Sequence, residues 1–262
     1  MADYEIHGAF CIPLGIAKLR GLIYVLCQFG PISIYAYETR FPRDLLMITL
    51  TETISSPKDM VGIDNSNTLY VWSVKKNCVW KIDMNNQYVV RWLSIKGVLH
   101  SLSVTSDSRL LVLSSFGFLN TLDVYEQDDT RITSIMFLWR NGDSYKAFQK
   151  PDGEFIVTYF CLNERRRFIM FLNANGRLIS QFSYSEKESI NGSFDACFDR
   201  YNNRLLFGNE KAMFLFDMNT FSWSQVGQRN NTGMWNLYCD GELNQVIGTR
   251  TSKMKIITTE GH

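Results

Sequence analysis

The sequence predicts an all-β fold, a six-bladed β-propeller of four-stranded blades in which the N-terminal strand completes the last blade. Three observations predict it. Apolar pairs rich in β-branched and aromatic residues recur about every 44 residues, a period that suits one four-stranded sheet per repeat. Polar turn residues separate the apolar runs, and no helical periodicity of comparable length competes with them. The second members of the recurring pairs are Val25, Val71, Val112, Val157, Phe207 and Ile247.

The second repeat shows all four strands of one blade. Its apolar runs lie at residues 60–63, 69–72, 78–82 and 88–92, in that order from the innermost strand to the outermost. Asn and Ser side chains between the runs hydrogen-bond the nearby backbone and tolerate unusual dihedral angles, which is typical of tight turns. One repeat therefore holds one complete blade.

The same order recurs along the chain. The predicted blades cover residues 13–50, 57–93, 98–138, 144–184, 193–227, and 233–262 together with 4–11. Within the fourth repeat, Asn175 and Gly176 form the dipeptide that is typical of a tight β-hairpin turn.

The two ends of the chain predict how the ring closes. The last repeat stops one strand short, and residues 4–11 precede the first repeat's own inner strand. Pairing this spare N-terminal strand with the final sheet would satisfy edge groups that otherwise invite aggregation. We therefore expect residues 1–262 to form a single propeller domain.

Composition and charge leave the partner class open. The chain has 27 Lys and Arg against 26 Asp and Glu, a net charge of +1, so no global attraction to nucleic acid or to an anionic membrane is expected. No apolar run approaches the roughly 20 residues that span a bilayer, and the N-terminus does not resemble a signal peptide. We expect a cytoplasmic protein, without membrane contact, that is a monomer or a weak oligomer.

The six cysteines are scattered without CxxC spacing, at positions 11, 27, 78, 161, 197 and 239. Most of them sit among apolar strand residues, and a cytosolic chain of this size needs no disulfide framework. The sequence therefore predicts reduced thiols that fill the core, and neither a metal-thiolate centre nor a cofactor.

The second repeat also carries a resemblance to a known family. Residues 57–64, 69–71 and 78–83 resemble the NHL-repeat family, whose six-bladed propellers have units of about this length. Residues 102–106 and 176–182 are similar to runs in the propellers of the tripartite-motif NHL group and of related uncharacterised invertebrate proteins. The resemblance covers the whole chain and implies a six-bladed propeller.

On a propeller, the loop that leads into each inner strand and the loop between the second and third strands share one face, where ligands and partners usually dock. The repeats place cations and aromatic rings on or near this face, at Lys58, Trp72, Lys75, Lys76, Phe116, Phe118, Arg140, Tyr145, Arg165, Arg166, Arg229, Trp235, Arg250 and Lys253. Acidic residues fall there too, at Asp59, Asp143, Glu164, Asp195 and Glu210.

The predicted function is non-enzymatic recognition of a protein partner, in which rings supply contact area and cations supply orientation. The predicted site residues are Trp72, Lys75, Tyr145, Arg165, Arg166, Trp235 and Arg250.

Two other functions stay open. Single-stranded RNA or another polyanion would also suit cations interleaved with rings, although the aromatic residues could instead pack between blades. A metal-dependent hydrolase of the six-bladed type would need oxygen or nitrogen ligands that converge from several blades. The starts of the inner strands offer Asp59, Asp195 and Asn236, but Lys146 at a comparable place would oppose a cation. We find no catalytic constellation in the sequence.

Overall fold

The computed structural model describes residues 4–6, 12–28, 32–38, 44–50, 54–138, 143–161, 163–185, 195–208, 213–226, 235–240, 245–250 and 253–258. Apart from one short 3-10 helix, Asp64–Ser66, the secondary structure of these residues consists of strands that pair into six four-stranded antiparallel sheets. The chain divides into two compact units. Unit 1 comprises Met1–Ile54 and Asn191–His262, and unit 2 comprises Ser55–Ile190.

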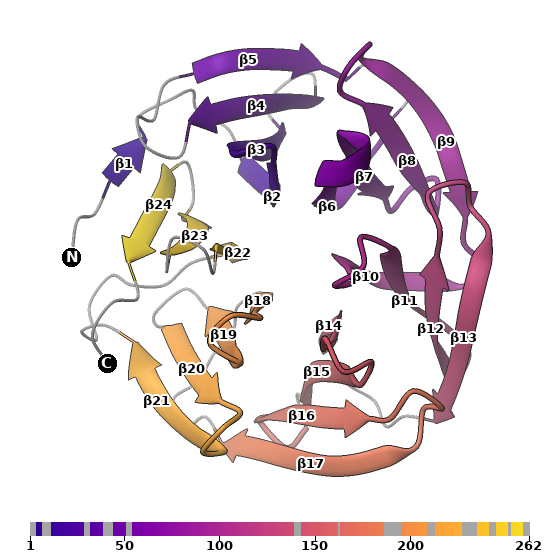
Figure 1. The fold of residues 1–262 in the computed structure, drawn as a ribbon, viewed down its shortest axis with the longest axis vertical. Coiled ribbons are helices and arrows are strands. Elements are labelled where there is room, and N and C mark those ends of the chain that lie inside the picture. The colour runs from indigo at the N-terminus through magenta and orange to yellow at the C-terminus, as the bar shows by residue number, and fades with distance from the viewer. Residues whose placement is uncertain are drawn as a thin grey trace. The chain divides into compact units, whose positions relative to one another are not determined.

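Unit 2 holds three consecutive sheets, each built from neighbouring strands in chain order (Figure 1). Blade 2 consists of β6 (Pro57–Ile63), β7 (Thr68–Ser73), β8 (Cys78–Asp83) and β9 (Tyr88–Ser94). Blade 3 consists of β10 (Val98–Val104), β11 (Leu110–Phe116), β12 (Leu119–Tyr125) and β13 (Arg131–Leu138). Blade 4 consists of β14 (Asp143–Gln149), β15 (Phe155–Cys161), β16 (Arg166–Leu172) and β17 (Leu178–Ser185). The inner strands β6, β10 and β14 lie side by side, as in a β-propeller. The predicted all-β class and four-stranded blades are confirmed.

In blade 2, the second strand is the most completely buried and the outer strand is the least buried. Every residue of β7 and of β15 is buried, whereas β9 at the outer edge is mostly exposed or half-buried. A strand that is covered on both faces reads as a continuous apolar run, because neither set of alternating side chains meets water. This explains why the second strand of each repeat gave the strongest sequence signal.

The core of unit 2 lies between neighbouring blades. Between blades 2 and 3, Tyr70 and Trp72 pack in one cluster with Leu99, Leu102 and Val112. Between blades 3 and 4, a second cluster joins residues of the two sheets, among them Leu111, Leu122, Ile135, Phe155, Val157 and Phe168. Burying an aliphatic or aromatic side chain of this size stabilises a fold by about 1.5–3 kcal/mol. Hydrophobic burial between adjacent sheets therefore holds the three blades of this unit together.

The predicted hairpin turn at Asn175 and Gly176 is present between β16 and β17. The backbone N–H of Gly176 donates to the carbonyl of Asn173 at 2.9 Å, and Gly176 has a positive φ of 79°. A Cβ at this position would lie 2.2 Å from the Cγ2 of Ile135 in blade 3. Glycine is required here both by the backbone conformation and by the close approach of the neighbouring blade.

Unit 1 also holds three sheets. Blade 1 consists of β2 (Ile12–Leu19), β3 (Leu22–Gln28), β4 (Ile32–Glu38) and β5 (Asp44–Thr49). Blade 5 consists of β18 (Asp195–Asp199), β19 (Arg204–Gly208), β20 (Met213–Asp217) and β21 (Ser222–Val226). Blade 6 consists of β22 (Trp235–Asp240), β23 (Gln245–Arg250), β24 (Lys253–Thr258) and β1 (Tyr4–Ile6). The inner strand β22 contacts both β18 and β2, so blade 6 lies between blades 5 and 1.

The N-terminal strand is the outer strand of blade 6. β1 pairs antiparallel with β24, and Tyr4 lies opposite Ile256 while Ile6 lies opposite Met254. The prediction that the N-terminal segment completes the final sheet is confirmed by this pairing. The last sheet is thus made from both ends of the chain.

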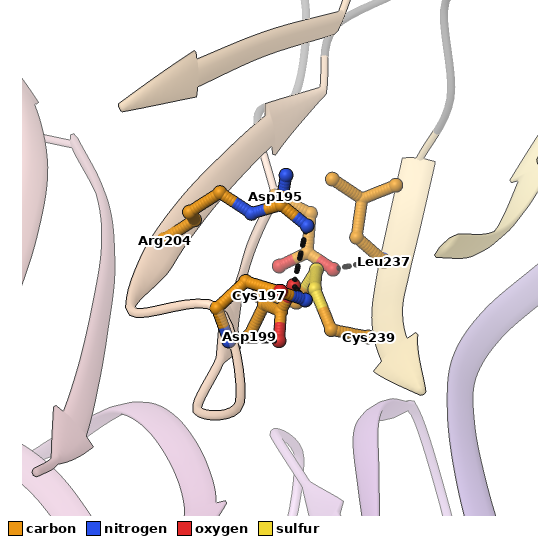
Figure 2. The surroundings of a disulfide bond; sticks show 7 residues. Asp195, Cys197, Asp199, Arg204, Leu237 and Cys239 are labelled. Carbon is orange, nitrogen blue, oxygen red and sulfur yellow. Dashed lines mark hydrogen bonds and ion pairs between the residues drawn. A yellow bond between two sulfur atoms is a disulfide. The ribbon is translucent and has the colours of Figure 1, made fainter. Parts of the chain in front are cut away.

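A disulfide joins two blades of unit 1 (Figure 2). It links Cys197 on β18 to Cys239 on β22, with 5.8 Å between the two Cα atoms and a sequence separation of 42. Cys27 is disulfide-bonded as well, whereas Cys78 and Cys161 are buried thiols. The prediction of reduced cysteines is therefore wrong for Cys27, Cys197 and Cys239. CxxC spacing could not reveal the Cys197–Cys239 pair, because adjacent inner strands bring together residues one whole repeat apart.

Polar contacts accompany this disulfide. The backbone N–H of Leu237 on β22 donates to the carboxylate of Asp195 on β18 at 2.6 Å. Close by, Arg204 pairs with the buried carboxylate of Asp199 at 3.0 Å (Figure 2). The inner strands of blades 5 and 6 are therefore joined by a covalent bond and by a charge-assisted hydrogen bond.

Candidate interaction surface

In each blade of unit 2, three features share one end of the sheet: the start of the inner strand, the loop between the second and third strands, and the end of the outer strand. This follows from the antiparallel order of the four strands. We call this end of unit 2 the top face, and the opposite end the bottom face. The sequence predicted that a partner docks on the top face.

The three inner strands of unit 2 share a β-bulge at the top face. The register shifts between Pro57 and Asp59 in β6, between Leu99 and Ser101 in β10, and between Asp143 and Lys146 in β14. A bulge adds residues to one strand of a pair and redirects their side chains. It places Lys58 and His100 outside the regular pairing of their strands.

Lys58 and His100 are both held by neighbouring side chains. The ammonium of Lys58 lies 4.9 Å from the ring centroid of Trp72, a cation–π contact. The Nε2 atom of His100 lies 2.7 Å from the hydroxyl of Ser115 on β11. Burial, together with the positive charge of Lys58, lowers the pKa of His100 to about 4, so its ring is neutral at physiological pH.

An ion pair joins blades 2 and 4 beside the bulges. The ammonium of Lys146 donates to the carboxylate of Asp59 at 2.7 Å, and both side chains are mostly buried. Between blades 3 and 4, the backbone N–H of Ala147 donates to the hydroxyl of Ser101 at 3.2 Å. The carboxylate of Asp59, the metal ligand considered from sequence for this unit, is therefore engaged by Lys146. Within the ranges that the structure describes, no three His, Cys, Asp or Glu side chains are grouped so as to hold a metal ion.

The predicted site residues do not all lie in one unit of the structure. Lys75, in the loop between β7 and β8, is exposed on the top face, as are Arg165 and Arg166 at the start of β16. Tyr145 lies on β14, also at the top face of unit 2, whereas Trp235 on β22 and Arg250 on β23 belong to unit 1. The side chains of Tyr145, Trp235 and Arg250 lie outside the described part of the structure.

Trp72 is placed differently from the prediction. Its side chain is only 3% exposed and packs between blades 2 and 3 with Leu99 and Leu102. Trp72 is therefore wrong as a ring that offers contact area to a partner. The ring of Trp72 packs against the next blade instead, which is the alternative that the sequence left open.

An apolar cluster lies at the top of blade 3. The sequence placed its Phe116 and Phe118 on this face but missed Val98 and Leu138. Phe116 is 75% exposed, Phe118 is 82% exposed and Leu138 is 80% exposed. Phe116 and Phe118 flank the turn between β11 and β12, and Leu138 ends β13. Val98 at the start of β10 is exposed at the same end. We call Val98, Phe116, Phe118 and Leu138 the apolar tip. Its signal in the sequence is the Phe-Gly-Phe run, in which bulky apolar residues occupy a turn that is usually polar.

Among the residues that the structure describes, no helix has the length and apolarity needed to cross a bilayer.

Comparison with known proteins shows the fold and no family. No family model matches the chain, and no curated protein matches it. Among solved structures, the chain is similar to Kuenenia stuttgartiensis hydrazine synthase, with 12% identity over 92% of this chain and 74% of that chain and a TM-score of 0.65. It is similar to a protein from Lactobacillus plantarum, with 11% identity over 91% of this chain and 77% of that chain and a TM-score of 0.63.

A third similar structure is YCF48 bound to D1 peptide. It is 11% identical over 94% of this chain and 77% of that chain, with a TM-score of 0.59. At these identities the three similarities show a common fold alone, because one fold hosts many unrelated functions.

Proposed function

We propose that this protein is a non-enzymatic recognition module that binds a protein partner through the top face of unit 2. The observation that carries the proposal is the apolar tip. Phe116, Phe118 and Leu138 are each at least three-quarters exposed at one end of one blade. Neighbouring exposed apolar side chains rimmed by polar residues are typical of protein interaction sites.

Two further points support a protein partner. Aromatic residues are enriched at protein interfaces, where a few large side chains carry most of the binding free energy. YCF48, which shares the fold, is bound to a peptide. A chain with this fold is therefore able to hold a polypeptide ligand.

A matched set of variants tests the proposal. The test variant replaces Phe116, Phe118 and Leu138 with Ser. The control variant replaces Tyr88, Tyr201 and Phe221, which are exposed aromatic residues outside the apolar tip, with Ser. Each tagged protein is used to capture partners from lysate of its native cells, and captured proteins are quantified by mass spectrometry. We expect at least one protein that wild type and control retain and the test variant loses about tenfold or more. An identical set for all three, or no protein with wild type, would contradict the proposal.

The second candidate function is binding of single-stranded RNA or another polyanion on the same face. The exposed Lys75, Arg165 and Arg166 favour it, since cations neutralise phosphates. In a filter-binding assay with a single-stranded RNA, affinity should fall steeply with added salt and should fall further on Arg165→Ala with Arg166→Ala. Arg131→Ala with Arg177→Ala, two cations of the bottom face, is the control. Affinity that ignores both salt and the test variant argues against RNA.

We also infer that the six sheets close into one six-bladed ring. The even spacing of the repeats and the completion of blade 6 by β1 support a closed ring, since a propeller without closure would leave two blade faces uncovered. Membership of the NHL-repeat family, a monomeric or weakly oligomeric state and a cytoplasmic location stay predictions from the sequence. The Cys197–Cys239 disulfide counts against the cytoplasm, because disulfides of structural type persist in oxidising compartments.

A further inference from the structure

The surface around the apolar tip combines exposed apolar side chains with cations from the neighbouring blade. We propose that it binds an acidic segment of the protein partner, one in which apolar side chains alternate with or adjoin carboxylates. The proposal rests on the proposed function and names the chemistry of the ligand. Four observations carry it.

First, the apolar residues form a row across three strands. Phe116 on β11 lies opposite Leu119 on β12, and Leu119 lies opposite Leu138 on β13. Directly opposed residues of an antiparallel pair project to the same side of the sheet. Met136, two residues before Leu138 on β13, projects to that side as well and is exposed. The row therefore offers one continuous apolar strip at the top of blade 3.

Second, a cationic loop is fixed beside this strip. The side chain of Asn77, in the loop between β7 and β8, donates to the carbonyls of Ile95 and Gly97 in the link between blades 2 and 3. The backbone N–H of Ile95 returns a hydrogen bond to the carbonyl of Asn77 at 3.1 Å. Lys75, Lys76 and Lys96 are exposed on these two connected segments.

Third, glycine brings this link against the apolar tip. A Cβ on Gly97 would lie 2.1 Å from the carbonyl oxygen of Ser115 and 3.3 Å from the Cβ of Phe116, and Gly97 has a φ of 104°. Only glycine accepts both the conformation and the approach. Gly97 therefore lies against Phe116, and the segments that carry Lys75, Lys76 and Lys96 adjoin Gly97 along the chain or through the hydrogen bonds of Asn77.

Fourth, the two faces of blades 2 and 3 carry opposite charge. Along the described residues of these blades, the top face has Lys58, Lys75, Lys76 and Lys96, and its one acidic side chain, Asp59, pairs with Lys146. The bottom face instead carries six acidic residues, Asp64, Asp83, Asp107, Glu126, Asp128 and Asp129, against three cations, Lys81, Arg109 and Arg131. A net charge of +1 for the whole chain conceals this separation. The field of the top face attracts an anionic ligand and repels a cationic one.

These features favour an acidic peptide segment over RNA. Bases stack on planar side chains, and Phe116 and Phe118 offer such rings, but Leu119, Met136 and Leu138 in the same strip have none. Trp72, the largest ring near the lysines, is buried. An aliphatic and aromatic strip bordered by lysines complements apolar side chains next to carboxylates.

Three pools of labelled synthetic peptides test the proposal by fluorescence anisotropy with the full chain. Each peptide has about ten residues, which span about 33 Å when extended. The first pool mixes Asp and Glu with Leu, Ile and Phe. In the second pool Ser replaces the apolar residues, and in the third Lys replaces the acids. A single-stranded RNA oligonucleotide of similar length is the fourth probe.

We expect the acidic apolar pool to bind at least about tenfold more tightly than the other three probes, and to weaken as salt is added. Lys75→Glu with Lys76→Glu and Lys96→Glu should weaken that binding about tenfold. Phe116→Ser with Leu138→Ser should do the same by removing apolar contact. The charge control, Arg131→Glu with Arg177→Glu on the bottom face, should leave it unchanged.

Several results would overturn the ligand assignment. Equal binding of the serine pool would show attraction by charge alone, tighter binding of the lysine pool would reverse the expected sign, and tighter binding of RNA would replace the peptide. No measurable binding of the acidic apolar pool would also reject it. If the partner capture described above still depends on the apolar tip, the recognition function stands while its acidic chemistry is wrong. If the acidic apolar pool does not bind and partner capture does not depend on the apolar tip, the proposed recognition function is wrong as well.

Discussion

His100 shows how a β-bulge changes the chemistry of one residue. In a regular strand its side chain would continue the alternation of β10, but the bulge between Leu99 and Ser101 takes it out of the pairing. There it meets the hydroxyl of Ser115 and the charge of Lys58, and its pKa falls to about 4. The neutral ring is therefore part of the folded structure.

This shift makes folding stability depend on pH. The unfolded chain gives His100 an ordinary pKa of about 6.5, so the unfolded state takes up a proton before the folded state does as pH falls. The contribution of the neutral His100 ring to the free energy of unfolding is fully present above about pH 6.5 and is lost as the pH falls toward 4. His100→Asn keeps a polar side chain without titrating in this range.

We expect urea unfolding to show that wild type loses about 1 to 3 kcal/mol more stability than His100→Asn between neutral and mildly acidic pH. Thr49→Asn, on an exposed position of β5, serves as a control that should follow wild type. Parallel pH profiles for wild type and His100→Asn would show that the ring titrates normally.

At the scale of elements, the inner strands of unit 1 are joined more firmly than sequence suggested. The disulfide between β18 and β22 joins cysteines at a sequence separation of 42, and Asp195 adds a hydrogen bond to Leu237 between the same strands. A disulfide stabilises a fold mainly because it reduces the conformational entropy of the unfolded chain. Its typical contribution to the free energy of unfolding is about 2–4 kcal/mol.

We therefore expect Cys197→Ala with Cys239→Ala to lower the free energy of unfolding by about 2–4 kcal/mol in non-reducing buffer. A reducing agent should lower the stability of wild type and leave the double variant almost unchanged. Cys78→Ala, which removes a buried thiol, is the control for lost packing. Intact-mass analysis after thiol labelling checks the bond directly, and labelling of both Cys197 and Cys239 in unreduced native protein would show that it is absent.

At the scale of the whole molecule, both ends of the chain contribute to one sheet. β1 covers the edge of β24, whose backbone groups would otherwise be exposed. An uncovered edge strand is a template for pairing with another chain. β1 therefore protects this edge of blade 6 from pairing with another chain.

Deletion of residues 1–6 tests this role. We expect a lower midpoint of thermal unfolding and concentration-dependent aggregation, measured by calorimetry and light scattering, because β24 becomes an open edge. A full-length variant with Glu5→Ser keeps the strand and should behave like wild type. A truncated protein that is as stable and as monomeric as wild type would show that β1 does not protect the edge.

Much of the blade structure followed from local sequence. The apolar runs of β7 and β15 arise because both faces of these second strands are covered. The Asn175-Gly176 dipeptide likewise predicted the turn that the structure shows between β16 and β17. The surface was harder to predict. Trp72 looked like a contact ring because its position along the chain is at the top of a strand, and only packing against Leu99 and Leu102 buries it.

The sequence by itself determined the strand pattern and the four-stranded repeat, because these depend on periodicity and on turn residues within short segments. It also predicted the pairing of the first strand with the last sheet, because the last repeat lacks one strand and residues 4–11 supply a spare one. Tertiary structure alone decided the Cys197–Cys239 bond, the Asp59–Lys146 ion pair, the burial of Trp72 and the exposure of Leu138. Each of the two pairs joins different blades, and the distance between inner strands is not encoded in any one repeat. Whether an apolar side chain is covered likewise depends on what the neighbouring blade places against it.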